Sequence, residues 1–331
     1  MTTFGDMVFH MGGVPVNGTM FSGKHFFVKP ISGSDGNSGR TPRLALKTLA
    51  KALSLATADK NDVVYLVAES NSASGTTDYQ SAALDWNKDG VHLIGVNSYN
   101  MIQQRSRIAQ LSTVKDLENL VTFSADNCFI ANISIFQGVA SSTATAPVAV
   151  IVSGQHNHFY NCTFSGNGDT GGSMDVAGAR SLLLYGAAEN QFTKCYIGLD
   201  TVSRATQDSE ISIRKNASAV GSTRNVFDNC VITGFAGAAG FTFVDASESG
   251  CMDRFLLFKN CTFINPVNST ATSMTEAVDT HASQGGAIIF SRSSLIGVAA
   301  GQHDAGSAGT VWVDDGAPAA NGDGGWAEPV D

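Results

Sequence analysis

Two loops hold the residues of this chain whose types and spacing could do chemistry. They span residues 166–180 and 200–210, and both are rich in acids. Two carboxyl groups that flank a glycosidic bond can hydrolyse it, one as proton donor and the other as base or nucleophile. The repeat described below places the two loops on adjacent coils, so we expect their acids to approach one another, with Arg204 or Arg214 nearby. The candidate catalytic residues are Asp169, Asp175, Asp200, Asp208 and Glu210.

Other features weigh against an enzyme. Sugar-binding grooves commonly present Trp and Tyr side chains for stacking, yet this chain has three Trp and six Tyr, and Trp312 and Trp326 lie near the C-terminus. The five candidate acids, out of 29 Asp and Glu, are close to what an ordinary protein surface carries. Polysaccharide cleavage therefore stays the second interpretation, and a chain without catalytic residues is the first.

The six cysteines do not form a metal-binding pattern. Zinc sites need pairs of ligands only two to four residues apart, whereas the nearest pair here is Cys251 and Cys261. We therefore predict neither a metal nor another cofactor. Cysteine is among the most buried residue types and behaves as a small hydrophobe. We expect four of them to be reduced and stacked in the interior: Cys162, Cys195, Cys230 and Cys261.

An internal repeat predicts the elements that position the two loops. Six segments align on anchor residues at positions 133, 162, 195, 230, 261 and 293, so that successive anchors are 29 to 35 residues apart. Each copy has an apolar residue three positions before the anchor and another two positions after it. Repeats of this length indicate a solenoid, in which each coil stacks on the next and buries one continuous core. Residues on one face of a straight strand are an even number of positions apart, yet the first apolar residue is three positions from the anchor and the second is two. This change from odd to even spacing indicates a bend inside each copy.

Asparagine and a second apolar run recur at fixed places in the repeat. Asn precedes the anchor by five or by one residue, and Asn tolerates left-handed backbone and can form ladders of amides between coils. Further strands are expected at 148–152, 182–185, 211–213 and 287–289, and the first coils at 63–67 and 91–96. The sequence therefore predicts an all-β fold, a single-stranded right-handed parallel β-helix over residues 25–297.

A helix is expected to cap the open end of the solenoid. Thr41 and Pro42 resemble an N-cap followed by proline at the first helical position. Apolar residues then follow at helical spacing, which predicts a capping helix at about 42–57. The residues with this spacing are Leu46, Leu49, Ala50 and Leu53.

The two ends of the chain are expected to be irregular arms. Residues 1–24 are apolar without periodicity, so they should fold against another surface or wrap their own solenoid. Residues 298–331 are acidic and rich in Gly and Ala, and they should be solvated or lie on a neighbouring subunit, anchored by 311–313. The residues expected to form an assembly interface are Phe4, Val8, Phe9, Val14, Val16 and Trp312.

Charge and hydropathy exclude several classes of partner. The formal net charge is −9 and no basic stripe is present, so we expect no nucleic-acid partner. No run of about 18 apolar residues suggests insertion into a membrane. The N-terminal residues lack the basic start and apolar stretch of a secretory signal, so synthesis in the cytoplasm without export by the usual route is expected.

The stretch from Phe27 to Val67 resembles the start of pectate-lyase-like β-helix proteins, many of them encoded by bacteriophages. It contains Gly33-Ser-Asp-Gly-Asn-Ser-Gly39 before the expected cap and then Val63-Val-Tyr-Leu-Val67. Phage members of this group include tailspike depolymerases and non-enzymatic virion proteins. The resemblance implies a virion protein. We interpret the chain as a non-enzymatic capsid decoration or cement protein, a homotrimer that contacts the major capsid protein, synthesised in the host cytoplasm. A tailspike-type depolymerase is the alternative, and a lone cytoplasmic or exported β-helix enzyme of pectate-lyase type is a third interpretation.

Overall fold

The computed structural model describes residues 22–70, 77–97, 100–102, 105–266, 272–298 and 311–313, and the backbone of 9–11 and 14–16. Phe4 and Val8, expected in an assembly interface, lie outside the described residues. The side chains of Phe9, Val14, Val16 and Trp312 lie outside them as well.

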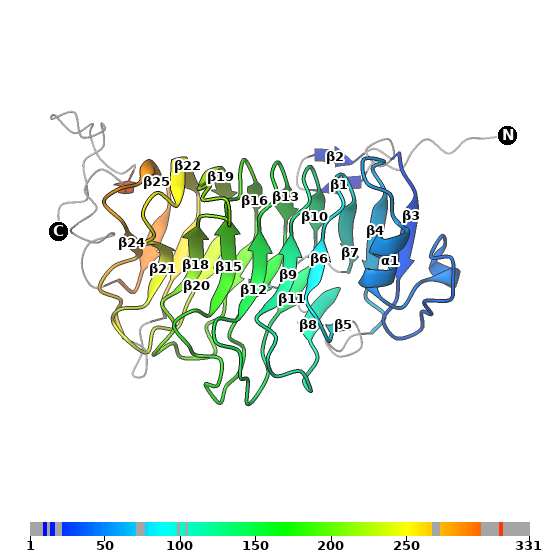
Figure 1. The fold of residues 1–331 in the computed structure, drawn as a ribbon, viewed down its shortest axis with the longest axis horizontal. Helices are drawn as coiled ribbons and strands as arrows, with labels where there is room; N and C mark the ends of the chain where they lie inside the picture. Colours follow the sequence, from blue (N-terminus) through cyan, green and yellow to red (C-terminus); the bar gives the residue numbers. More distant parts are fainter. Residues whose placement is uncertain are drawn as a thin grey trace.

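Three parallel sheets run side by side along one axis and enclose the core (Figure 1). The ten-stranded sheet contains, in spatial order, β3 (His25–Val28), β4 (Val63–Val67), β7 (His92–Val96), β10 (Phe129–Ala131), β13 (His158–Tyr160), β16 (Gln191–Thr193), β19 (Ser222–Asp228), β22 (Met252–Lys259), β25 (Gly285–Ser291) and β27 (Val311–Val313). The eight-stranded sheet contains β5 (Thr77–Gln80), β8 (Arg107–Gln110), β11 (Ser134–Phe136), β14 (Thr163–Ser165), β17 (Tyr196–Gly198), β20 (Val231–Thr233), β23 (Thr262–Ile264) and β26 (Ser294–Ile296). The seven-stranded sheet contains β6 (Leu84–Trp86), β9 (Asn119–Phe123), β12 (Val148–Val152), β15 (Arg180–Tyr185), β18 (Ser209–Arg214), β21 (Thr242–Ala246) and β24 (Val278–Thr280).

The predicted right-handed parallel β-helix is confirmed, because each coil from β4 to β24 contributes one strand to each sheet and pairs with the coils on either side. The repeat sets the register. Phe159 pairs with Phe192 in the ten-stranded sheet, and Phe164 pairs with Ile197 in the eight-stranded sheet. Outside the solenoid sheets, β1 (Phe9–Met11) and β2 (Val14–Val16) form an antiparallel pair. No helix in the described residues is long and apolar enough to cross a membrane.

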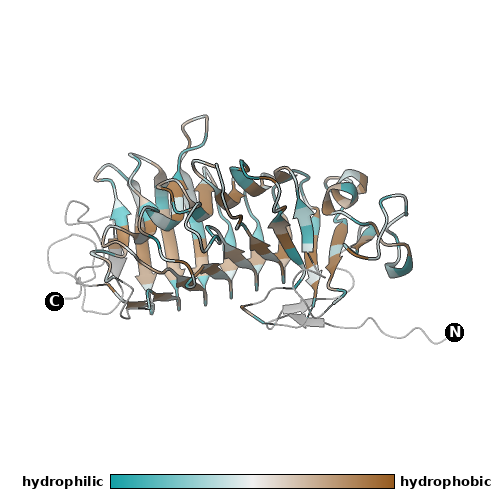
Figure 2. Cartoon of the chain, turned by 90° about the horizontal axis from the view of Figure 1, so that it is seen from below, coloured by the Kyte–Doolittle hydropathy of each residue, from teal (hydrophilic) through white to brown (hydrophobic). Residues whose placement is uncertain are grey.

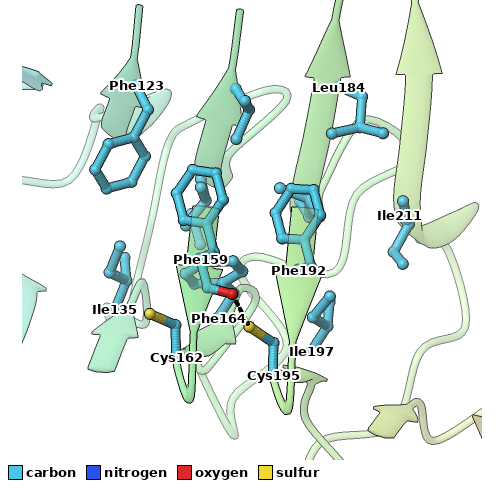
Figure 3. Packing of buried hydrophobic residues seen from close by; sticks show 14 of the residues in the cluster. Phe123, Ile135, Phe159, Cys162, Phe164, Leu184, Phe192, Cys195, Ile197 and Ile211 are labelled. Atoms are coloured by element: carbon cyan, nitrogen blue, oxygen red, sulfur yellow. Dashed lines mark hydrogen bonds between the residues drawn. The ribbon is translucent and has the colours of Figure 1, made fainter. Parts of the chain in front are cut away.

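Phenylalanine and cysteine form continuous columns inside the solenoid (Figure 3). The rings of Phe159 and Phe192 stack with their centroids 4.8 Å apart, and the rings of Phe192 and Phe227 are 4.3 Å apart. The six cysteines are free and buried, and the Sγ atom of Cys195 donates to the carbonyl of Phe159 one coil earlier. Along the strands of Figure 2, hydrophobic colour dominates, whereas the loops are largely hydrophilic.

The bend expected before each anchor is a single residue in left-handed backbone. Asn161 has φ 51° and Asn229 has φ 55°, and Lys194 takes the same conformation at the equivalent place. The left-handed conformation costs Asn less energy than most other residues with a side chain, which explains why Asn recurs at this position. The left-handed residue turns the chain between β13 and β14, so that Phe159 and Cys162 both face the core despite their odd spacing.

The second asparagine position forms the expected ladder between coils. The Asn157 amide N–H donates to Oδ1 of Asn190, and the Asn190 N–H donates to Oδ1 of Asn225. The Nδ2 atoms of Asn190 and Asn225 donate to the carbonyls of Gly154 and Ala187. All three side chains are buried, so the ladder satisfies backbone groups that would otherwise lack partners.

The predicted capping helix at 42–57 is wrong in its extent. The structure has a 3-10 helix at Pro42–Leu44 and an α-helix, α1, at Leu49–Leu55. Leu46 lies between them in extended backbone, because it bridges in parallel to Val28 and exchanges hydrogen bonds with that strand. Thr48 caps α1 by accepting from the amide of Lys51.

Two strand assignments near the C-terminal end also differ from expectation. Residues 287–289 belong to β25 of the ten-stranded sheet, and the strand equivalent to β12 and β15 is β24. The misassignment arose because β25 is long and apolar, whereas Val278–Thr280 has a charged residue at its centre. Strand β27, expected as an anchor in the C-terminal arm, pairs with β25 of the same chain and adds a rung beyond residue 297.

Candidate functional site

A groove of about 690 Å³ lies on the outer face of the seven-stranded sheet. Its floor contains Ile151, Leu183 and Ser212, which are register partners on β12, β15 and β18. Their neighbours in sequence face the core, and alternation along a strand therefore turns these three outward. Tyr185 and Glu118 also line the groove.

Two arginines, both bound to one buried aspartate, form the charged part of the groove. Arg214 Nη2 lies 2.5 Å and Arg180 Nη2 lies 3.1 Å from Oδ2 of Asp245. Burial alone would raise the pKa of Asp245, but the hydrogen bonds and the charge of Arg214 lower it to about 2. Ser212 Oγ donates to the same carboxylate. The Asp245 carboxylate therefore holds both guanidinium groups in place beside the groove.

Glu118 lies at the edge of the groove and is also engaged within the protein. It accepts hydrogen bonds from the backbone N–H groups of Thr145 and Ala146 and from the Thr145 hydroxyl. Burial would raise the pKa of Glu118, and these hydrogen bonds lower it. This carboxylate therefore holds the loop before β12 and is not poised to donate a proton.

The candidate acids of the first loop are occupied by local hydrogen bonds. Asp169 accepts from the amides of Gly171 and Ser173 and, at 2.5 Å, from the Ser173 hydroxyl. Asp175 accepts from the amides of Ala205 and Gln207 in the second loop. The two loops therefore lie on neighbouring coils as expected, and Asp175 joins them.

The acids of the second loop are separated by the wall of the solenoid. Asp200 and Asp208 are exposed, and Asp208 Oδ2 lies 3.4 Å from Nη2 of Arg180. Glu210 is fully buried, where it accepts a 2.5 Å hydrogen bond from the Ser181 hydroxyl. Burial raises the pKa of Glu210, and the nearby Arg204 opposes this effect. The five candidates are thus not brought together into one surface cluster.

Arg204, expected near the acids, is also buried inside the solenoid. Its Nε atom lies 3.5 Å from Oε1 of Glu210, and its Nη1 donates to the carbonyl of Val202. Asn167 and Gln207, both buried, are joined by a 2.8 Å hydrogen bond. Sequence reasoning missed Arg180, Asp245 and the floor of the groove. The only available signal was the alternation within β12 and β15.

Nothing in the described part of the chain gathers three or more potential metal ligands from His, Cys, Asp or Glu. The carboxylates at the groove already accept from arginine or from backbone N–H groups. The groove offers a largely apolar floor and one partly exposed cation, because the Arg214 side chain is 28% exposed and that of Arg180 only 6%, and both guanidinium groups pair with Asp245.

Comparison with known proteins supports the fold. No protein-family model matches the chain, and no curated protein sequence matches it. Among solved structures it is similar to the deglycosylated pectin methylesterase of Aspergillus niger, with a TM-score of 0.54 and 16% identity over 88% of this chain and 84% of that one. It is also similar to pectate lyase Pel9A, with a TM-score of 0.54 and 12% identity over 82% of this chain and 63% of that one. A protein titled Geobacillus virus E2 ORF18 matches with a TM-score of 0.46 and 12% identity, over 76% of this chain and 46% of that one. The chain thus shares the parallel β-helix fold with proteins that act on polysaccharides.

Proposed function

We propose that this chain is a non-enzymatic structural component of a bacteriophage particle, a capsid decoration or cement protein. In this role it acts as a homotrimer and contacts the major capsid protein. The resemblance of residues 27–67 to the start of phage-encoded β-helix proteins supports the phage assignment. The location is the virion, after synthesis in the host cytoplasm.

The engagement of the carboxylates within the protein carries the non-enzymatic part of the proposal. A general acid needs a raised pKa and contact with the substrate. A raised pKa is found for the carboxyl groups of Asp78, to about 6, and Glu210. Both are buried, and Asp78 accepts from the first amide of α1. Neither lines the groove, and the pKa of both Glu118 and Asp245 is lowered.

The interior is suited to a rigid structural element. Stacked phenyl rings, buried cysteines and the asparagine ladder repeat the same contact from coil to coil. In a solenoid, stability is a sum of such contacts between neighbours. Self-association is proposed to use the terminal segments, which contain the predicted interface residues Phe4, Val8, Phe9, Val14, Val16 and Trp312.

Particle analysis tests this proposal. The chain should be found by mass spectrometry in purified virions, and the isolated protein should have the mass of a trimer by light scattering. It should also bind particles that lack it. Absence from purified virions would refute the virion role, and a monomer at all concentrations would refute the trimer.

A tailspike-type depolymerase is the second candidate, and the groove with its two arginines favours it. Its test is release of reducing ends or unsaturated sugars from capsule or lipopolysaccharide by the purified protein. Loss of such an activity in Arg214→Ala or in Asp208→Ala, with the β-rich circular dichroism spectrum retained, would establish this candidate. Tyr79→Phe, on a different sheet, is the matched control.

A further inference from the structure

The outer face of the ten-stranded sheet carries two columns of side chains that follow the register of its strands. Their neighbours, such as Val64 and Phe159, are buried in the core, so alternation turns both columns outward. The first column contains His25, Val63, His92, Phe129, His158, Gln191, Val226, Leu257 and Ile289. The second column contains Phe27, Tyr65, Ile94, Ala131, Tyr160, Thr193, Asp228, Lys259 and Ser291.

Chemistry changes along the second column. Over the first five rungs both columns are apolar or aromatic, and the rings of Phe27 and Tyr65 stack with centroids 5.1 Å apart. The later rungs of the second column present polar and charged groups, including Asp228 and Lys259, whose Oδ2 and Nζ atoms lie 3.7 Å apart. We call the outward residues of β3, β4, β7, β10 and β13 the aromatic face.

Burial also changes along the columns, although the backbone geometry is the same. On the aromatic face, Val63 and Ala131 have no exposed surface and Ile94 has 9%. In later rungs of the first column, Val226 and Leu257 are half-buried. Ala131 is a small side chain between Ile94 and Tyr160. The loop after β7 also reaches this part of the sheet, where Asn97 Nδ2 donates to the carbonyl of Asn132. The complete burial of Val63, in the same column as the half-buried Val226, indicates additional cover within this single chain.

The path of the chain identifies a segment that can provide this cover. The amides of Gly23 and Lys24 donate to Asn61 and Asp62, at the end of the coil that leads into β4. The preceding segment therefore starts at the edge of the aromatic face. Five rungs at about 4.8 Å spacing extend over roughly 19 Å. The seven residues 17–23 can span about 23 Å, which suffices to carry β1 and β2 across the face.

The composition of that segment matches the aromatic face. Residues 1–21 contain a single charged side chain, Asp6. Its apolar residues would not remain in water at about 25 cal/mol per Å² of exposed surface. They are Phe4, Met7, Val8, Phe9, Met11, Val14, Val16, Met20 and Phe21. The mixed charges of Asp228 and Lys259 on later rungs offer no such match.

We propose that residues 9–16 of the same chain pack over the aromatic face and cover its first five rungs. A short tether gives the segment a local concentration in the millimolar range at this face, which favours its own solenoid over a second copy. This inference goes beyond the proposed function and does not depend on it. Phe9, Val14 and Val16 would then contact their own solenoid, so that of the proposed interface residues Phe4, Val8 and Trp312 remain for contacts between copies.

Nitration of tyrosine, read by mass spectrometry, tests this proposal. Tyr160 is 4% exposed on the aromatic face, whereas Tyr79 on β5 is 48% exposed and serves as an internal reference. In the full chain Tyr160 should react severalfold more slowly than Tyr79. Deletion of residues 1–21 should raise the rate at Tyr160 severalfold and leave the rate at Tyr79 unchanged.

A second variant guards against misfolding of the deletion. Val14→Asp combined with Val16→Asp should release Tyr160 to the reagent while the circular dichroism spectrum stays β-rich. Thr2→Asp combined with Thr3→Asp is the control and should have no effect. Continued protection of Tyr160 in both the deletion and the Val14→Asp, Val16→Asp variant would overturn the proposal. Rapid nitration of Tyr160 in the full chain would overturn it as well. Loss of protection on dilution from micromolar to nanomolar protein would assign the cover to a second copy instead.

Discussion

Arg204 and Glu210 face each other inside the solenoid, with no exposed surface and with Arg204 Nε 3.5 Å from Glu210 Oε1. Neither of these two atoms has a hydrogen-bond partner in the described structure. The pair sits where the second acidic loop enters β18. Space for the glutamate is available because Gly198 has no side chain, and a Cβ there would lie 3.2 Å from Cδ of Glu210.

Replacing one partner of this pair should lower the free energy of unfolding more than replacing both. Arg204→Met leaves a buried carboxylate without its counter-charge, which costs about 3–5 kcal/mol. Arg204→Met combined with Glu210→Leu should cost clearly less, because no charge remains buried. Urea denaturation of the two variants measures the difference. A double variant as unstable as the single one would contradict this account.

The asparagine ladder should be a strong stabiliser at its central position. Asn190→Ala removes the acceptor of the Asn157 amide and the donor to the Gly154 carbonyl. Leaving such buried groups unpaired costs about 1–3 kcal/mol each. The neighbouring exposed Gln191→Ala is the control and should change stability by no more than about 0.5 kcal/mol. Equal thermal shifts in the two variants would show that the ladder contributes nothing.

The sequence predicted the fold well because its strongest signals are local and repeat in every coil. The anchor cysteines, the apolar residues around them and the asparagine at the bend each have the same place in successive coils, as Cys162 and Cys195 illustrate. The helix at 42–57 was predicted too long because periodicity alone could not show that Leu46 bridges to Val28.

The candidate site was predicted less well because its contacts join distant positions. Asp245 binds Arg180, 65 residues earlier in the chain, and no local pattern links the two. Glu210 follows a polar stretch typical of a surface loop, yet it lies near the start of β18 and its side chain is buried. The sequence indicated which coils carry the loops and not which side of the wall each acid occupies.

The buried cysteines should resist modification in the folded protein. Burial raises the pKa of Cys195, and it raises that of Cys128 to about 12 and that of Cys251 to about 11. The thiolate is the reactive species, and all six side chains are buried away from the reagent, so labelling by a thiol reagent at pH 8 should be slow for all six. Addition of denaturant should then expose six rapidly reacting thiols. Fast labelling of Cys162, Cys195, Cys230 or Cys261 in native protein would disprove the interior stack.

The pairing of Asp245 with Arg214 should make stability depend on pH below about 4. The pKa of Asp245 is about 2 in the folded protein and about 3.9 when unfolded. A lowered folded pKa contributes stability that is present above the unfolded value and is lost as the pH falls through the folded value. The contribution is about 2–3 kcal/mol at neutral pH. Asp78, with a pKa raised to about 6, acts in the opposite direction between about pH 4 and 6.

A comparison with Asp245→Asn isolates this contribution, because Asp78 is present in both proteins and its effect cancels. The difference in unfolding free energy between wild type and Asp245→Asn should be largest above pH 5 and should shrink as the pH falls towards 2. Asp208→Asn is the matched control: its carboxylate is 56% exposed and 3.4 Å from Arg180. A surface pair of this kind contributes at most about 1 kcal/mol, so this variant should show little dependence on pH. Urea denaturation from pH 2 to 7 measures both differences. A constant difference for Asp245→Asn across this range would show that the pKa of this carboxylate is not lowered in the folded protein.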